Sequence, residues 1–503
     1  MKQVLLILSV LLLFSLHIPI AFGQLQEPEF SLEQSEIEAH LRFLSSDELA
    51  GRRTGEFGNN LAARYLASYF QSYGLQPIEG ANGYFQTFAL QRTTPPSAAS
   101  MKWGKRKLEY KKDFVILDGG PIALKKSASV FVGYGTKESD FEGKEMEGKV
   151  MVALVGMPEG GGVSSLATAQ KIKQTFAKSK GAIAVIELYN GPIPWGVVLR
   201  FMGSSRVDMV QPGMIQESSI PHVYLKDTDP SYAQQYKGKK APTIGFVSDG
   251  IDIRQDMTSQ NVAGWIEGSD PDLKNEYVLL SAHYDHVGTG KNGGQKYTAE
   301  DSIFNGARDN GIGTVALLAA AKSLGESKPK RSVIFLGLSG EELGLLGSRY
   351  YVENPLVPLD KTVFNLNSDN GGYNDTSAVS IMGFHRVGAE KEMEQAAGAF
   401  GFRVIADPAP EQNLFDRSDN VSFAKKGIPA PSFGPGMDKF DKEILQYYHQ
   451  VVDEVSTLNF SYIHKFCQAY AHAARLIGNK SDTPRWIEGD KYEAAFKKLY
   501  GID

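Results

Sequence analysis

Acidic and histidine residues follow successive apolar segments in the C-terminal half of this chain. They are His283, Asp309, Glu342, Asp369 and His449, in the strings SAHYDHVG, GARDNGIG, GLSGEELG, NLNSDNGG and QYYHQVVDE. The first four stand at the carboxyl end of an apolar strand or at a helix start, where open α/β sheets gather their ligands. Carboxylates and imidazoles without thiolates suit zinc or another divalent ion in a catalytic site. Together the five residues predict a two-metal hydrolase.

The charges of these residues agree with that prediction. The carboxylates of Asp309, Glu342 and Asp369, together with one bridging hydroxide, balance the charge of two Zn²⁺ ions, as a partly buried cluster requires. Glu341 and Glu342 are adjacent carboxylates that would repel each other, and a nearby cation would relieve the repulsion. Their adjacency suggests a division of roles in which one binds metal and the other transfers protons.

Each motif also has a simpler interpretation. Asp309 could be a helix N-cap, since Asp is favoured there, although the glycines at 306, 311 and 313 permit the unusual backbone that a bridging carboxylate needs. Asp285 lies two residues after His283 and points the same way in extended chain. It can accept the second ring N–H of that histidine or hold a nearby backbone segment. His286 is interpreted as structural.

Two other motifs do not lead to a different chemistry. Gly288 to Gly293 matches G-x-G-x-x-G, but a dinucleotide site needs a helix to begin there, and the polar, glycine-containing string that follows predicts a loop. No G-x-S-x-G elbow is present, because Glu341 stands where the last glycine would be. Cys467, the one cysteine, lies in an amphipathic helical pattern that favours core packing over a catalytic thiol.

Composition limits the class of protein. The chain has 503 residues, 42% of them hydrophobic and 22% charged, with a formal net charge of −5, which is ordinary for a globular protein and lacks the basic stripe of a nucleic-acid-binding protein. Residues 1–23 combine a basic start, an apolar stretch and a small-residue cleavage site, so they predict a signal peptide rather than a membrane anchor. With no disulfide possible, an exported chain suits a bacterial periplasm or the outside of the cell, with no membrane span after cleavage.

Strands and helices alternate after residue 250, which predicts an α/β fold with a mixed, mostly parallel sheet and helices on both faces. Residues 120–247 have short β runs and glycine-rich turns and predict an inserted β-rich domain. The full expected division is a signal peptide over 1–23, the first part of a catalytic domain over 24–119, the insert over 120–247, the main catalytic domain over 248–479, and a tail with a closing helix over 480–503.

At these motifs the chain resembles the co-catalytic zinc aminopeptidases of metallopeptidase clan MH. The resemblance covers most of the mature chain and includes the strings LSSDELAGRRTGEFGNNLAARYL, GARDNGIGTVALL, GLSGEELGLLGS and RSDNVSFAKKGIPAPSF. Residues 120–247 resemble, more faintly, the protease-associated domain that some members carry. The sequence departs from many relatives at Asn420, where they have a histidine.

The resemblance implies roles for individual residues. His283, Asp309 and Asp369 would bind one zinc ion, and Asp309, Glu342 and His449 the other. Glu341 would be the general base acting on a water activated by two zinc ions, and Asp285 would orient His283. The bond between Asp309 and Asn310 would be cis. The implied enzyme is an exported metallo-aminopeptidase that hydrolyses N-terminal residues from peptides with a free N-terminus.

Three alternatives stay open at this point. A carboxypeptidase or dipeptidase of the same fold would need a basic pocket, for which Arg308, Arg386 and Arg417 are the candidates. A one-zinc glutaminyl cyclase would have no need of the second set of metal ligands. A receptor-like binding protein without activity would usually have lost ligands, whereas this chain keeps them all. The sequence does not specify the preferred N-terminal residue, the role of the insert or the oligomeric state.

Overall fold

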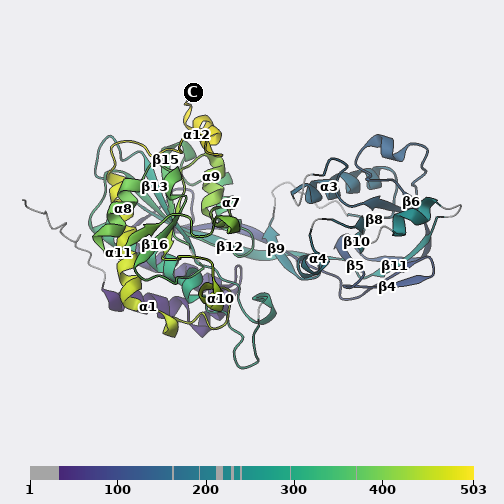
Figure 1. Ribbon diagram of the computed structural model, residues 1–503, viewed down its shortest axis with the longest axis horizontal. Helices are drawn as coiled ribbons and strands as arrows, with labels where there is room; N and C mark the ends of the chain where they lie inside the picture. Colours follow the sequence, from purple (N-terminus) through teal and green to yellow (C-terminus); the bar gives the residue numbers. More distant parts are fainter. Residues whose placement is uncertain are drawn as a thin grey trace, which may run out of the picture.

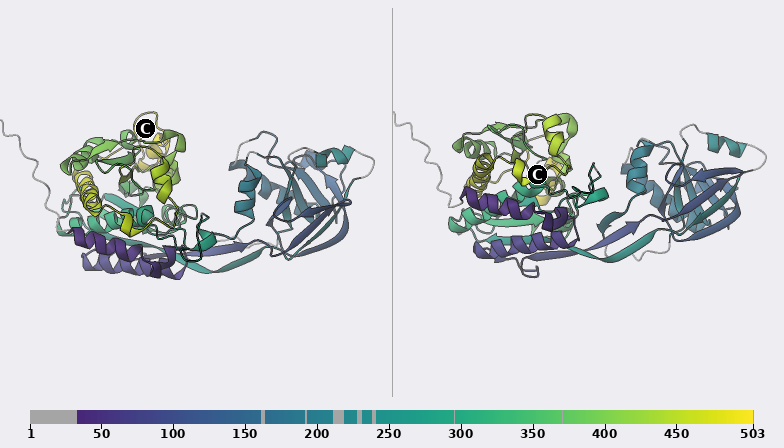
Figure 2. Two further views of the ribbon diagram at one scale, coloured as in Figure 1. Left: turned by 60° about the horizontal axis from the view of Figure 1, so that its bottom comes forward. Right: turned by 90° about the horizontal axis from the view of Figure 1, so that it is seen from below.

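Two lobes make up the structure, a computed structural model that describes residues 33–160, 164–191, 193–210, 219–227, 231–237, 241–294, 296–369 and 371–502. The predicted signal peptide lies outside the described residues. Figure 1 shows the larger lobe joined to the smaller one by long paired strands, and both views in Figure 2 show the same narrow connection. Within the described ranges, no helix has both the length and the apolar character that a membrane span requires.

The larger lobe is built on a 10-stranded sheet with the order β17-β16-β18-β15-β13-β14-β12-β2-β9, in which β1 also pairs with β12. Its strands are β1 Gln76–Pro77, β2 Phe85–Thr94, β9 Arg206–Met209, β12 Asp252–Ile266, β13 Tyr277–His283, β14 Ser332–Leu338, β15 Thr362–Asn367, β16 Ala378–Met382, β17 Arg403–Ile405 and β18 Ser432–Pro435. Pairing is parallel from β14 through β13 and β15 to β18. It is antiparallel from β14 through β12 and β2 to β9.

Helices cover both faces of this sheet, as Figure 1 shows, which confirms the predicted fold class. On one face lie α1 Gln34–Leu44, α2 Phe57–Ser72, α6 Gly313–Glu326, α8 Glu390–Ala399 and α11 Phe460–Asn479. On the other lie α7 Leu346–Glu353, α9 Asn420–Lys426 and α12 Glu493–Tyr500, while α10 Lys442–Tyr447 lies in the connection before α11. Because both faces are covered, β14 and β15 are buried along their whole length, which explains their continuous apolar runs.

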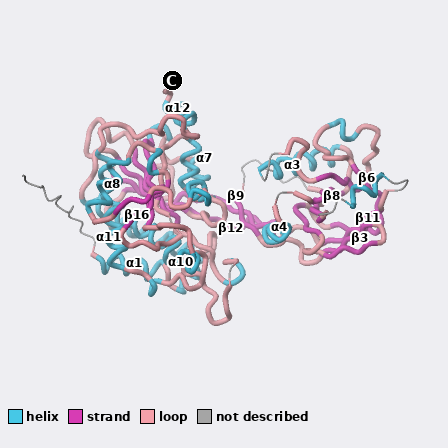
Figure 3. The backbone as a smooth tube through the Cα atoms, in the orientation of Figure 1, coloured by secondary structure: helices cyan, strands magenta, loops and turns pink. Residues whose placement is uncertain are grey.

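The smaller lobe contains an 8-stranded sheet with the order β4-β3-β11-β6-β7-β8-β10-β5. Its strands are β3 Ala99–Trp103, β4 Arg106–Glu109, β5 Phe114–Asp118, β6 Ile122–Phe131, β7 Val150–Leu154, β8 Ala184–Tyr189, β10 His222–Lys226 and β11 Thr243–Ser248. Its helices are α3 Ser164–Ser179, α4 Trp195–Met202 and α5 Ser231–Gln234, the first two drawn in cyan beside the magenta strands in Figure 3.

The expected start of the insert at residue 120 is too late. β3 pairs with β11, and β5 pairs with β10, so residues 99–118 belong to the sheet of the smaller lobe rather than to the larger lobe. Strand β9 lies within the range predicted for the insert, but it pairs with β2 and so belongs to the larger sheet. Both differences have one cause, since the partner of each strand lies far along the chain and local composition does not reveal it.

Candidate metal centre

The proposed ligands lie at the ends of three neighbouring parallel strands. His283 is the last residue of β13, the Glu341–Glu342 pair follows β14 after two residues, and Asp369 follows β15 after one. Strand β13 lies between β14 and β15 and pairs in parallel with both. The next strand along the chain, β14, lies on one side of it, and the one after that, β15, lies on the other. This is the switch point of an open sheet, where strand ends from different parts of the chain meet.

Asp309 reaches this edge from the turn before α6. The Asp309–Asn310 bond is cis, so that expectation is confirmed. Gly306 has φ of +59°, and a Cβ on it would lie 2.4 Å from the backbone oxygen of Asp309, so only glycine fits there. The Asn310 side-chain amide donates to the backbone oxygen of Ser368 at 2.9 Å, which ties this turn to the end of β15.

Two groups of side chains around this edge of the sheet have donor atoms close enough to hold a metal ion. They are His283, Asp309 and Asp369 in one group, and His286, Asp309, Glu342 and His449 in the other. Asp309 belongs to both, and its two oxygens face different histidines. One oxygen is 3.5 Å from Nε2 of His283 and the other is 3.1 Å from Nε2 of His449.

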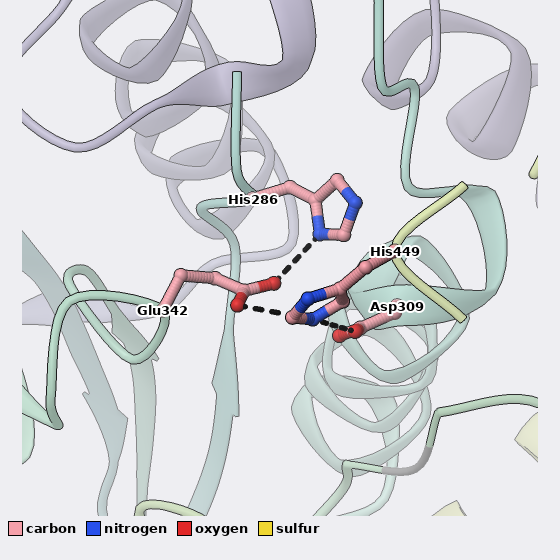
Figure 4. A group of neighbouring side chains, drawn as sticks. All are labelled: His286, Asp309, Glu342 and His449. Carbon is pink, nitrogen blue, oxygen red and sulfur yellow. Dashed lines mark ion pairs between the residues drawn. The ribbon is translucent and has the colours of Figure 1, made fainter. Parts of the chain in front are cut away.

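The remaining contacts complete each group. Nε2 of His283 is 3.3 Å from Oδ1 of Asp369. Nε2 of His449 is 3.2 Å from Oε2 of Glu342. Figure 4 shows Glu342 and His449 pointing toward each other, with Asp309 on the far side of the His449 ring. The structure thus brings all five predicted ligands together, although His449 comes from the segment after α10 and lies 80 residues beyond Asp369 in number.

His286 is the residue that sequence reasoning missed. Its Nδ1 is 2.7 Å from Oε1 of Glu342, and the side chain is buried against the ring of His449 at a centroid distance of 5.5 Å. It therefore either supplies a further ligand or holds the Glu342 carboxylate in place. The signal was the presence of His286 three residues after His283, but the loop that follows β13 could turn in several ways.

Asp285 braces the two glutamates more closely than it braces His283. Its carboxylate accepts from the backbone N–H groups of Glu341 at 3.2 Å and Glu342 at 3.4 Å, and from the hydroxyl of Thr54 at 2.9 Å. Nδ1 of His283 lies 3.2 Å from the backbone oxygen of Asp285 and 3.7 Å from its carboxylate. Of the two roles that the sequence left open, holding the backbone has the shorter contacts.

Burial and neighbouring charges shift the pKa values of the two glutamates in opposite directions. Burial raises the pKa of Glu341 well above its ordinary value, and the charges of Asp369 and Glu342 add to the shift. Burial also opposes ionisation of Glu342, but His449 and His286 outweigh it and hold the pKa of Glu342 well below its usual range. Glu342 thus favours the charged form that a cation needs, and Glu341 has the higher proton affinity of the two carboxylates.

Arg52 joins the N-terminal segment to this edge of the sheet. The side chain is only 1% exposed, and its guanidinium donates to the backbone oxygens of Tyr284 at 2.8 Å, Asn305 at 2.6 Å and Gly306 at 3.0 Å, and also to that of Leu44. Tyr284 directly follows His283, and Asn305 and Gly306 lie in the turn that leads to Asp309. Arg52, which lies in the string LSSDELAGRRTG, therefore stabilises the two loops that carry His286 and Asp309.

We expect replacement of Arg52 by methionine to lower the free energy of unfolding by about 3 to 5 kcal/mol, because buried carbonyls lose their donor. Urea unfolding followed by circular dichroism measures the change. Arg64 is exposed on α2, and its replacement by methionine is the matched control, with an expected change within about 0.5 kcal/mol. A loss below about 1 kcal/mol for Arg52 would show that the brace is dispensable.

A pocket opens onto the predicted ligands. Among its lining residues, Asp309, Glu341, Asp369 and His449 belong to the cluster or its immediate surroundings, and the others include Met382, Leu414, Arg417, Met437, Phe440 and Tyr448. The apolar members come from segments that sequence reasoning did not single out. The pocket therefore combines a carboxylate-rich floor with an apolar wall and one guanidinium.

The comparisons with known proteins agree with this geometry. Residues 261–474 match the model of Peptidase family M28. The matched range includes every predicted metal ligand and Glu341.

Curated relatives and a solved structure extend the comparison. The chain is 37% identical to the "Vacuolar membrane protease" of Saccharomyces cerevisiae over 114 residues. This alignment covers 23% of this chain and 10% of that protein. Over 295 residues the chain is 26% identical to "Aminopeptidase YwaD" of Bacillus subtilis, which covers 57% and 55%. The chain thus spans less than two thirds of the length of either relative. The aminopeptidase from Aneurinibacillus sp. strain AM-1 has a similar fold, with a TM-score of 0.55, 20% identity, and coverage of 91% of this chain and 95% of that one.

Proposed function

We propose that the protein is an exported zinc-dependent aminopeptidase that removes N-terminal residues from peptides. The observation that supports this most is the position of Asp309, whose two carboxylate oxygens face the histidines of two separate ligand groups. A carboxylate shared in this way suits two divalent ions held side by side. The match of residues 261–474 to a peptidase family model and the similarity to a protein named as an aminopeptidase support the same reaction class.

In this proposal His283, Asp309 and Asp369 hold one Zn²⁺, and Asp309, Glu342 and His449 hold the other. When bound, the ions supply a water of lowered pKa and positive charge at the developing oxyanion. Glu341 takes the proton of the attacking water and passes it to the leaving amine. Asp285 holds Glu341 in position by accepting a hydrogen bond from its backbone N–H group. The carboxylates around the pocket attract the free α-ammonium group of the substrate, which favours cleavage at the N-terminus.

The remaining parts of the proposal concern location and domains. Export would follow from residues 1–23 acting as a signal peptide, with the mature protein in the periplasm or outside the cell. The smaller lobe would be a protease-associated domain inserted in the catalytic domain. The long pair of strands β2 and β12 joins it to the larger lobe (Figure 1).

Metal analysis combined with a substrate panel tests the proposed function. We expect about two zinc ions per chain by mass spectrometry, rapid release of the first residue from a C-terminally amidated peptide, and no cleavage of its N-acetylated counterpart. Cleavage of the acetylated peptide with a free C-terminus would instead indicate a carboxypeptidase. One tightly bound zinc ion with pyroglutamate formed from an N-terminal glutamine would indicate a cyclase. Absence of metal after zinc is supplied would exclude the proposed centre.

A further inference from the structure

Of the three arginines that could form a basic pocket, two are used inside the fold. The guanidinium of Arg308 is 4% exposed and donates to Asp453 at 3.1 Å and to the hydroxyl of Thr457 at 2.6 Å. The guanidinium of Arg386 pairs with Asp490 at 2.7 Å and stacks over an aromatic ring. Neither is free to bind a substrate.

Arg417 differs from both. It is exposed at the end of a short 3₁₀ turn and lines the pocket over the predicted metal ligands. Its guanidinium donates from Nη2 to the hydroxyl oxygen of Tyr448 at 3.3 Å. Asp416 beside it is bound by Lys491 and by the hydroxyl of Tyr492 at 2.8 Å. Among the described residues, then, Arg417 has no carboxylate within ion-pair distance, although Asp309 and Asp369 line the same pocket.

This arrangement is electrostatically unusual. The carboxylates of the pocket floor are the ones that two zinc ions would neutralise, so with metal bound they no longer attract the guanidinium. Arg417 then contributes an unbalanced positive charge to a pocket whose wall is apolar. A guanidinium held this way suits bidentate binding of a carboxylate, because its planar fork matches the two oxygens.

We propose that Arg417 binds a carboxylate of the substrate that lies close to its N-terminal residue, so that the preferred substrates are short or acidic peptides. This inference rests on the proposed aminopeptidase function and gives it a substrate class. Two sources supply that chemistry, the side chain of an N-terminal acidic residue and the free C-terminal carboxylate of a dipeptide. Both place an anion within a residue or two of the scissile bond.

Two matched substrate pairs separate these sources. Leu-Leu and Leu-Leu-amide differ only in the C-terminal carboxylate, while Glu-p-nitroanilide and Gln-p-nitroanilide differ only in the side-chain charge. For the zinc-loaded full-length protein we expect kcat/KM to favour the anionic member of one pair by about 10- to 100-fold, the range of a charged hydrogen bond. Arg417→Gln should bring that ratio close to one, and Arg417→Lys should keep part of it.

The controls make each outcome decisive. Arg64→Gln, which removes an exposed arginine from α2, should leave both ratios as they are in the parent protein. If neither ratio differs between the parent protein and Arg417→Gln, Arg417 does not recognise a carboxylate and the inference is wrong, while the proposed function stands. If the zinc-loaded parent cleaves none of the four substrates, the proposed function itself fails.

Discussion

Replacing Glu341 with glutamine is expected to lower kcat by about 100- to 10,000-fold, the usual contribution of a general base. The amide has nearly the same shape as the carboxyl group but cannot accept the proton of the attacking water. Glu341 is not a member of either group of potential ligands, so the zinc content should remain that of the parent protein. Steady-state kinetics on an N-terminal leucine substrate and mass spectrometry of the same sample measure both quantities.

Glu342→Gln is the matched control for that experiment, because it makes the same chemical change one residue along the chain. Its carboxylate lies 3.2 Å from His449 and 2.7 Å from His286, within a potential ligand group. We therefore expect Glu342→Gln to lose metal as well as activity, whereas Glu341→Gln loses activity alone. A near-normal rate for Glu341→Gln would show that another group moves the proton.

The larger lobe could be predicted well because its sequence signals are local. Buried parallel strands are continuous apolar runs, as in β14, and helix α6 between β13 and β14 is an Ala- and Leu-rich run that is mostly buried. Residues at the carboxyl ends of such strands must lie at one edge of the sheet, which is why the sequence alone groups His283, Glu342 and Asp369.

The features that could not be predicted depend on distant partners. His286 becomes part of the site only because the loop after β13 turns toward Glu342, 56 residues further along the chain. The insert begins earlier than expected because β3 finds its partner in β11, more than a hundred residues away. Only the structure distinguishes Arg417, which faces the pocket, from Arg308, which is buried beside Asp453. In none of these three cases does the composition of the neighbouring sequence indicate which distant segment the residue or strand will contact.

Asp309→Ala should have the largest effect on metal content. Its carboxylate belongs to both ligand groups, so its removal takes a ligand from each of the two proposed zinc ions at once. We expect affinity for both ions to fall by more than about 100-fold, since even the outer partners of metal ligands are worth about 10- to 100-fold. Zinc per chain after dialysis against dilute chelator measures this, and we expect it to fall close to zero.

Asp369→Ala is the comparison that distinguishes loss of both zinc ions from loss of one. It removes a carboxylate from the His283 group alone, so about one zinc ion per chain should survive the same dialysis. Asp360→Ala, an exposed carboxylate before β15, controls for loss of negative charge and should retain the parent metal content. If Asp309→Ala and Asp369→Ala lost the same single ion, Asp309 would serve one metal only. The second group, with His286 beside Glu342 and His449, would then have to hold its ion without a shared carboxylate.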